Sequence, residues 1–325
     1  MDDRSTKDLY TDNGQYTQQR LEVHRTIINE LIEGLSAATN QPVVHLMGGG
    51  TASGKSALSG LMINGFKSER ESVLVIDSDR IKSMLPEYTQ LQQRDPEKTA
   101  SILHDESSDI SEKLYMKATE NKLNIIFDGT MKNREKYERY IDIAKSNGYK
   151  VSGVLADVPL EEAYRRENIR FLKEQRRVPA EIVKESHAMV PVTFHHIKDK
   201  LDSFFLYDMS ERHPAQFYVK DNNQIRVLDE ERLASFYAKG DLEADQWIKL
   251  EKPIELKELI KQAKGMPTGA QVTAELLKSP VQNYKVDVVN GREVMNFRLQ
   301  DGKKTFAREN ALFIAREEKS DPGSS

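Results

Sequence analysis

The chain has 325 residues, with 48 Lys or Arg against 52 Asp or Glu, so its formal net charge is −4. It contains no Cys, which excludes a disulfide scaffold, thiolate metal sites and a cysteine nucleophile. The nearly balanced charge argues against nucleic-acid binding through the overall field. No apolar run approaches the roughly 18 residues of a membrane span, and the N-terminus lacks signal-peptide features. We therefore expect a cytoplasmic protein with no membrane contact.

Residues 1–15 are polar and predict a loose arm, and a helical pattern follows to about Ala38. Five short apolar runs then alternate with longer helical patterns. Such runs are typical of strands buried on both faces, joined by crossover helices. The pattern predicts an α/β fold with a parallel five-stranded sheet flanked by helices. The runs lie at 43–47, 73–76, 124–127, 151–156 and 204–207.

The pattern changes after about Ser210. Residues 216–219 and 224–228 predict a small hairpin, and Asn290-Gly291 and Asp301-Gly302 predict the turns of a final β-meander. We therefore divide the chain into three parts: an N-terminal arm and helix over 1–40, an α/β domain over 41–235, and a smaller C-terminal α+β module over 236–325 that ends in the meander.

Residues 49–56 match the Walker A pattern G-x-x-x-x-G-K-[ST], between the first apolar run and a helical stretch. Glycines let backbone N–H groups approach phosphates closely, and the helix N-terminus adds partial positive charge. We expect a P-loop NTPase-type fold that binds ATP and Mg²⁺, with Lys55 on the β- and γ-phosphates and Ser56 on the metal. The expected nucleotide-binding residues are Gly49, Gly50, Thr51, Ala52, Ser53, Gly54, Lys55, Ser56 and Ala57.

Asp77-Ser78-Asp79 follows the second apolar run, and ligands of open α/β sheets bind outside the carboxyl ends of the strands. No acidic pair follows the third run and no guanine-reading motif occurs, which disfavours a motor or a switch GTPase. Asp79 is the candidate general base that accepts the proton of the phosphoryl acceptor. The alternative is an N-cap for a helix starting near Ile81. Asp77 is expected to orient Mg²⁺ or its waters.

An arginine-rich segment follows the fourth run. Arg166 and Arg170 lie four residues apart and can share a helix face, with Arg165 beside them and Arg176 further on. Guanidinium groups suit a transferring phosphoryl group, so the segment predicts a lid that closes over the phosphates. The alternative is a solvated surface helix, because several glutamates neutralise it.

Together these motifs resemble the zeta toxin family of P-loop kinases, whose toxin members phosphorylate UDP-N-acetylglucosamine at a sugar hydroxyl. The similarity covers roughly 15–210, and the 41–235 domain is then a zeta toxin-like kinase domain. It rests on Tyr16-Thr17, Arg20 to His24, 49–56, 75–79, Ser111-Glu112, 128–130 and 176–179.

The resemblance implies that Asp79 is the general base and that Glu112 and Thr130 contact the substrate. It also implies two lid arginines: Arg176 matches one, and Arg165, Arg166 and Arg170 compete for the other. The family's E-G-T-x-R reads Asp128-Gly129-Thr130-Met131-Lys132 here. Lys132 is a point charge where a bidentate arginine is expected, so contacts to substrate phosphate can differ.

The sequence thus predicts an ATP-dependent kinase acting on a hydroxyl of a small molecule, most simply a nucleotide sugar such as UDP-N-acetylglucosamine. A toxin role would imply a proteinaceous antitoxin as partner. Two alternatives stay open: a polynucleotide end kinase, and an ATP-regulated binding module without phosphotransfer. The expected catalytic residues are Lys55, Asp79, Arg166, Arg170 and Arg176; the substrate residues Asp77, Asp79, Glu112, Thr130 and Lys132; the metal ligands Ser56 and Asp77.

Overall fold

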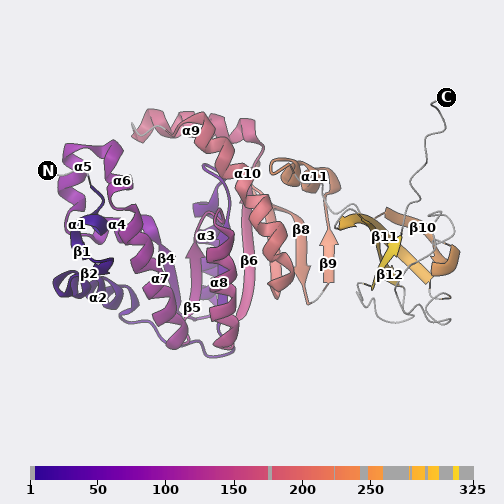
Figure 1. Cartoon of the computed structure of the whole chain (residues 1–325), viewed down its shortest axis with the longest axis horizontal. Coiled ribbons are helices and arrows are strands. Elements are labelled where there is room, and N and C mark those ends of the chain that lie inside the picture. The colour runs from indigo at the N-terminus through magenta and orange to yellow at the C-terminus, as the bar shows by residue number, and fades with distance from the viewer. Residues whose placement is uncertain are drawn as a thin grey trace, which may run out of the picture. The chain divides into compact units, whose positions relative to one another are not determined.

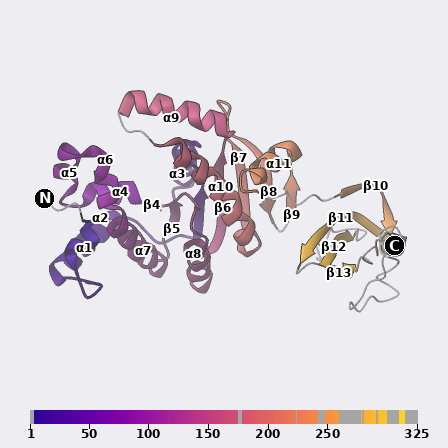
Figure 2. The ribbon, with the colours of Figure 1, turned by 45° about the horizontal axis from the view of Figure 1, so that its top comes forward.

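The structure is a computed structural model that describes residues 4–174, 178–222, 224–241, 248–258, 278, 280–289, 292–299 and 310–314. The chain divides into two compact units, Met1–Ala244 and Asp245–Ser325. Figures 1 and 2 show the elements of each unit from two directions. Among the described residues, no helix combines the length and the apolarity that crossing a bilayer requires.

A mostly parallel sheet forms the centre of the first unit, in the order β4-β5-β3-β6-β7-β8-β9. The five predicted strands are confirmed and are parallel, while the predicted hairpin extends the sheet by two antiparallel strands. The parallel strands are β3 (Val43–Gly48), β4 (Val73–Asp77), β5 (Asn124–Asp128), β6 (Lys150–Asp157) and β7 (Ser203–Asp208). The hairpin strands are β8 (Ala215–Asp221) and β9 (Gln224–Val227).

Helices pack on both faces of this sheet because successive strand residues point to opposite faces. Leu46 and Phe127 face one apolar cluster, whereas their neighbours Met47 and Ile126 face the other. The helices are α2 (Gln18–Ile32), α3 (Lys55–Ser68), α4 (Ser78–Met84), α5 (Tyr88–Arg94), α6 (Pro96–Ile102), α7 (His104–Glu120), α8 (Arg134–Ser146), α9 (Leu160–Glu174), α10 (Ala180–Ile197) and α11 (Glu230–Ala238), with the short 3₁₀ turn Lys198–Lys200 after α10.

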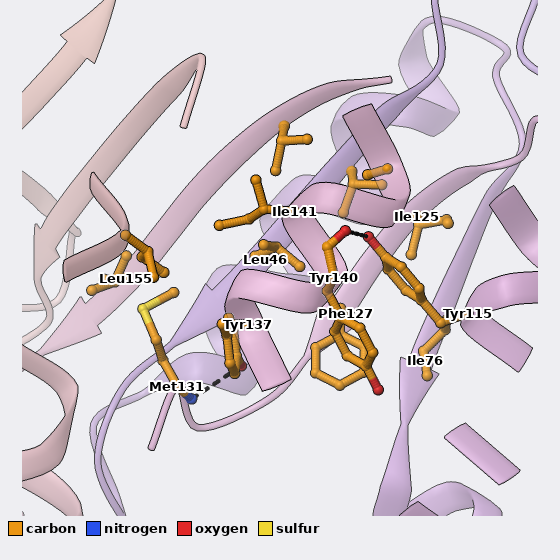
Figure 3. Packing of buried hydrophobic residues seen from close by; sticks show 14 of the residues in the cluster. Leu46, Ile76, Tyr115, Ile125, Phe127, Met131, Tyr137, Tyr140, Ile141 and Leu155 are labelled. Carbon is orange, nitrogen blue, oxygen red and sulfur yellow. Dashed lines mark hydrogen bonds between the residues drawn. The ribbon is translucent and has the colours of Figure 1, made fainter. Parts of the chain in front are cut away.

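Aromatic side chains hold α7 and α8 to β5 (Figure 3). Tyr115 of α7 stacks on Tyr140 of α8 with ring centroids 4.3 Å apart, and Phe127 meets Tyr140 edge-on at 4.8 Å. The buried Tyr115 hydroxyl donates to the Tyr140 carbonyl at 2.8 Å. The ring contacts and this hydrogen bond together fix the two helices beside the end of β5.

The N-terminal segment is not a loose arm, so that expectation is wrong. It forms α1 (Thr6–Tyr10) and a hairpin of β1 (Thr11–Asp12) and β2 (Gln15–Tyr16). The reason is Asp109 on α7, which pairs with Lys7 at 2.9 Å and accepts the Tyr16 hydroxyl at 2.8 Å. One acid on the helix thus anchors both elements of the polar segment.

The described part of the second unit contains an antiparallel sheet in the order β10-β11-β12-β13. Each strand pairs with the next one along the chain. The strands are β10 (Ile248–Glu255), β11 (Pro280–Val289), β12 (Arg292–Leu299) and β13 (Asn310–Ile314).

Candidate active site

The loop between β3 and α3 is packed so closely that only glycine fits at its start. Gly49 has φ +149°, and a Cβ there would lie 2.6 Å from the Ala156 carbonyl oxygen and from the Ser53 hydroxyl. The Lys55 ammonium donates to the carbonyls of Gly49 at 2.9 Å and Gly50 at 3.4 Å. The lysine thus lies over its own loop, where an incoming phosphate would meet it.

Four other charged residues surround Lys55. Burial lowers the pKa of its ammonium; Asp128 and Asp79 oppose that shift, while Arg170 and Lys132 add to it. These residues come from β5, α4, α9 and the segment before α8, so the fold gathers them from separate parts of the sequence. Mixed charge around a desolvated lysine is typical of a functional site.

Two aspartates lie side by side at the carboxyl edge of the sheet. Asp77 of β4 pairs in register with Asp128 of β5. Burial raises the pKa of Asp128, as do Asp77 and Asp79, whereas Lys55 lowers it. Because β5 lies between β4 and β3, the acidic segment after β4 and the loop after β3 flank the same strand end, where ligands of parallel sheets bind.

The structure assigns the helix cap to Asp77 and not to Asp79. Helix α4 begins at Ser78, and the Asp77 carboxylate accepts the Asp79 backbone N–H at 2.8 Å. The alternative interpretation of Asp79 as an N-cap is therefore wrong. Asp79 lies in the first turn with its side chain 73% exposed and paired with Lys82 at 2.8 Å. Most of its side chain is therefore exposed to solvent.

Arg166 and Arg165 face in different directions on α9. Arg165 is 64% exposed and pairs with Glu162. Arg166 also pairs with Glu162 at 2.6 Å, but it donates to the Met209 carbonyl, and its guanidinium lies 3.5 Å from where a Cβ on Gly54 would be. In Figures 1 and 2, α9 runs above α3. Of these two neighbours, Arg166 is the one placed at the phosphate loop.

Arg170 lies one turn further along the same face of α9. It pairs at 2.6 Å with Glu167, whose other oxygen accepts the Val178 backbone N–H. The positive charge of Arg170 lowers the pKa of the Lys55 ammonium. The fourth candidate, Arg176, lies outside the described residues. Arg170 thus lies close enough to the phosphate loop for its charge to be felt at Lys55.

The other expected substrate residues lie in the middle of α7 and in the segment after β5. Glu112 on α7 pairs with Arg139 on α8 at 2.6 Å. Thr130 is exposed, and its carbonyl accepts the Gly49 N–H at 3.3 Å. Lys132 is partly exposed, and its positive charge lowers the pKa of the Lys55 ammonium. Thr130 and Lys132 are thus at the phosphate loop, while Glu112 pairs from α7 to α8.

Tyr137, which the sequence did not single out, holds the segment after β5 in place. Its buried hydroxyl donates to the Met47 carbonyl at 2.8 Å. It also accepts the Met131 N–H at 3.0 Å, as Figure 3 shows. Met131 has φ +58°, an uncommon conformation for a residue with a side chain. The two hydrogen bonds stabilise this turn and with it the positions of Thr130 and Lys132.

Helix α10 contacts the phosphate loop through residues that no motif in the sequence indicated. The Ser186 hydroxyl accepts the Thr51 N–H at 2.9 Å, and His187 Nε2 lies 2.9 Å from the Thr51 carbonyl. A Cβ on Gly50 would lie 2.3 Å from the His187 ring. Burial lowers the pKa of His187, so the ring is a neutral donor that fixes the loop from its convex side.

Replacing His187 with alanine should loosen this loop, because the Thr51 carbonyl loses its donor and the ring leaves a void beside Gly50. We expect the free energy of local opening to fall by about 1–3 kcal/mol. Hydrogen–deuterium exchange of the 49–54 backbone should speed up accordingly. His213, which is exposed, supplies the control His213→Ala. Unchanged exchange in His187→Ala would contradict a supporting role.

A buried ionic cluster joins α11 to the same edge of the sheet. Asp157, the last residue of β6, accepts hydrogen bonds from Arg232 at 2.6 Å and from Lys239 at 2.6 and 2.7 Å. Arg232 also binds Asp208 at the end of β7. His187 Nδ1 lies 4.0 Å from Asp157. The ionic cluster therefore lies behind the histidine that contacts the phosphate loop.

The donors in this region fit a nucleoside triphosphate with its metal. Ser56 at the start of α3 is exposed. Ser56 and Asp77 offer the hydroxyl and carboxylate oxygens that Mg²⁺ prefers. No group of three or more His, Asp or Glu able to hold a metal was found among the described residues, so phosphate oxygens and water would complete the coordination.

Comparison with known proteins gives the family context. The sequence model described as Zeta toxin matches residues 29–228. Toxin PezT of Streptococcus pneumoniae serotype 4 is 22% identical over 225 residues, which are 66% of this chain and 83% of that protein. A calmodulin calcium-dependent NAD kinase of Arabidopsis thaliana is 30% identical over 138 residues, which are 38% of this chain and 26% of that protein.

Solved structures share the fold. One from the PezAT chromosomal toxin-antitoxin system of Streptococcus pneumoniae has a TM-score of 0.53 at 19% identity, covering 66% of this chain and 86% of that one. The AvrRxo1-ORF1:AvrRxo1-ORF2 complex with ATP has a TM-score of 0.55 at 18% identity, covering 80% and 89%. These similarities confirm the predicted α/β fold with its parallel sheet and flanking helices.

Proposed function

The chain belongs to the zeta toxin family of ATP-using kinases and is an ATP-dependent phosphotransferase; from this premise we propose that its acceptor is a hydroxyl of a nucleotide-linked small molecule. The observation that carries the proposal is the convergence of Lys55, Asp79 and Arg170 at one sheet edge. We assign the reaction to the 41–235 domain, with ATP along the 49–57 loop and the lid arginines of α9 above it.

In the proposed reaction the acceptor oxygen attacks the γ-phosphorus while its proton passes to the Asp79 carboxylate. The new P–O bond forms as the bond from the γ-phosphorus to the β–γ bridging oxygen breaks, and ADP leaves with that electron pair. Lys55 and the guanidinium groups of Arg166 and Arg170 neutralise the charge on the transferred group. Bound Mg²⁺, held through Ser56 and Asp77, would supply further charge neutralisation.

Two acceptors follow from separate observations. UDP-N-acetylglucosamine follows from the family resemblance, with Glu112, Thr130 and Lys132 as its contacts. NAD follows from the relative named as an NAD kinase, which is 30% identical over 138 residues. Both carry a diphosphate between two sugars or nucleosides. We therefore propose a nucleotide-linked diphosphate as the acceptor class.

Incubation of the full chain with γ-labelled ATP tests the proposal directly. The panel should contain UDP-N-acetylglucosamine, NAD, nucleosides and a 5′-hydroxyl oligonucleotide. Label on either diphosphate supports the proposal. Label on the oligonucleotide alone, lost at higher salt, supports a nucleic-acid end kinase instead. ATP binding without any labelled acceptor in single turnover supports a binding module.

Lys55→Met should lower phosphoryl transfer by about 10²–10³-fold, because the charge on the β- and γ-phosphates loses its clamp. Initial rates with the acceptor that the panel identifies measure the effect. Lys67 is an exposed lysine in the last turn of the same helix, so Lys67→Met is the matched control. If Lys55→Met transfers phosphate at the native rate, the proposed role of the phosphate loop in the reaction is wrong.

We also propose a toxin role with a protein antitoxin as partner, on the similarity to PezT and to the PezAT system. The Lys55→Met variant serves here too. Expression of the native chain alone in bacteria should arrest growth, whereas expression of the variant should not. Growth arrest by both proteins would separate toxicity from phosphoryl transfer.

A further inference from the structure

Lys136, in the first turn of α8, carries a charge that the described structure leaves without a counterion. Its ammonium lies 5.6 Å from the ring centroids of Phe127 and Tyr140 and 3.0 Å from the Ser108 hydroxyl. Figure 3 shows these two rings packed together at the end of β5. Burial lowers the pKa of the Lys136 ammonium. A desolvated cation held only by a hydroxyl and two ring faces is costly.

The acids around Lys136 are already paired with other residues. Glu112 binds Arg139 at 2.6 Å. Asp109 binds Lys7 at 2.9 Å and the Tyr16 hydroxyl at 2.8 Å. Within the described part of the chain, neither acid forms an ion pair with Lys136. Lys136 is partly buried, and because its neighbouring acids are paired elsewhere, an anion from outside the protein can serve as its counterion.

Lys136 is at the end of the sheet where the acceptor binds in the proposed function. Phe127, whose ring lies under the ammonium, directly precedes Asp128 of the acidic edge. Ser108, its hydrogen-bond partner, lies one turn before Ser111, whose hydroxyl contacts Ser78 at 3.1 Å. The ammonium thus contacts α7 one turn from the residue through which α7 meets the start of α4.

Lys132 and Lys136 lie on either side of the N-cap of α8. Lys132 comes just before the cap residue Asn133, and Lys136 lies in the first turn, where the helix dipole also favours an anion. Two cations near one helix start suit a ligand with two adjacent phosphates better than a ligand with a single phosphate. This pairing also compensates for the lysine that stands where the family pattern expects a bidentate arginine.

We propose that Lys136, together with Lys132, binds the diphosphate of the acceptor, so that Lys136 selects nucleotide-linked diphosphates over neutral sugars and nucleosides. This inference rests on the proposed function, because it names the acceptor class of the same site. The bound diphosphate supplies the counterion that Lys136 lacks in the free protein. The competing explanation is that Lys136 only packs against Phe127 and Tyr140.

Equilibrium binding of UDP-N-acetylglucosamine and of NAD to the full chain tests the inference, by titration calorimetry with native protein and Lys136→Met. Methionine keeps the length and apolar packing of the side chain but removes its charge. We expect the Kd of the diphosphate that binds to rise by about 10–100-fold, the worth of one charged hydrogen bond. The midpoint of urea unfolding should stay the same or rise, because a desolvated charge is gone.

Two variants sharpen the test. Lys136→Arg should retain most of the affinity, because it keeps the charge. Lys145→Met removes an exposed charge nine residues along the same helix, where Lys145 pairs with Asp202, and should bind like the native protein. An unchanged Kd in Lys136→Met overturns the inference, with or without a lower urea midpoint. So does a native protein that binds neither diphosphate.

This outcome is separate from that of the proposed function. Diphosphate binding that depends on Lys136, without phosphoryl transfer, supports the site and contradicts the kinase acceptor assignment. Transfer to a diphosphate acceptor at the native rate and native KM by Lys136→Met supports the proposed function and overturns the role of Lys136.

Discussion

Asp79→Asn should lower kcat for phosphoryl transfer by about 10²–10⁴-fold, the usual worth of a general base. The asparagine side chain keeps the shape and the capacity to contact Lys82 through its carbonyl oxygen, but it cannot take the acceptor proton. Asp79 suits this role because it lies in the first turn of α4 with its side chain 73% exposed. Initial rates at saturating ATP and acceptor measure the effect.

The matched control is Asp142→Asn, which removes an exposed carboxylate from α8 and should leave kcat unchanged. ATP binding by Asp79→Asn should also remain close to native, because Lys55 and the 49–54 loop are intact. If Asp79→Asn transfers phosphate at the native rate, a group other than Asp79 takes the proton of the acceptor hydroxyl. Asp128 would then be the next candidate, since it pairs in register with Asp77.

Glu106→Gln should destabilise the Met1–Ala244 unit by about 3–5 kcal/mol, because it leaves a buried guanidinium partly unpaired. Glu106 is fully buried on α7, and Arg20 of α2 reaches it with Nε at 2.5 Å and Nη2 at 2.8 Å. His24 donates to the same carboxylate at 2.7 Å. Urea unfolding of the full chain, followed by circular dichroism, should show the loss.

This loss should depend on pH in a defined direction. Burial works to raise the pKa of Glu106, but hydrogen bonds from Arg20 and His24 hold it at about 2, below the usual 4.5. A carboxylate with a lowered pKa stabilises the fold above its unfolded pKa and loses that contribution as the pH falls through the folded one. The native protein and Glu106→Gln should therefore differ fully above pH 4.5 and converge toward pH 2.

Glu22→Gln is the control for this charge change. Glu22 pairs with Arg25 on the surface of α2, with both side chains more than half exposed, and such pairs contribute about 0–1 kcal/mol. A similar stability loss in both variants, or a gap between native protein and Glu106→Gln that does not narrow in acid, would argue against the buried ion cluster.

Features that depend on neighbours in the chain could be predicted from the sequence. The five parallel strands follow from runs of apolar, largely β-branched residues, and the phosphate loop follows from glycines placed between a strand and a helix. Asp77 and Asp79 follow from their place directly after a strand. Each of these inferences needs only the local chain and the rule that the carboxyl ends of parallel strands share one edge.

The tertiary structure alone decided which distant residues complete the site. His187 supports the loop at Thr51 from 136 positions away, and the Lys136 ammonium lies beside the rings of Phe127 and Tyr140. It also decided that Asp77 caps α4, and that Arg166 and not Arg165 meets the loop. Periodicity fixes the spacing of residues along one element but not which faces of two elements pack together, so these contacts existed only once the sheet had brought the helices to its carboxyl edge.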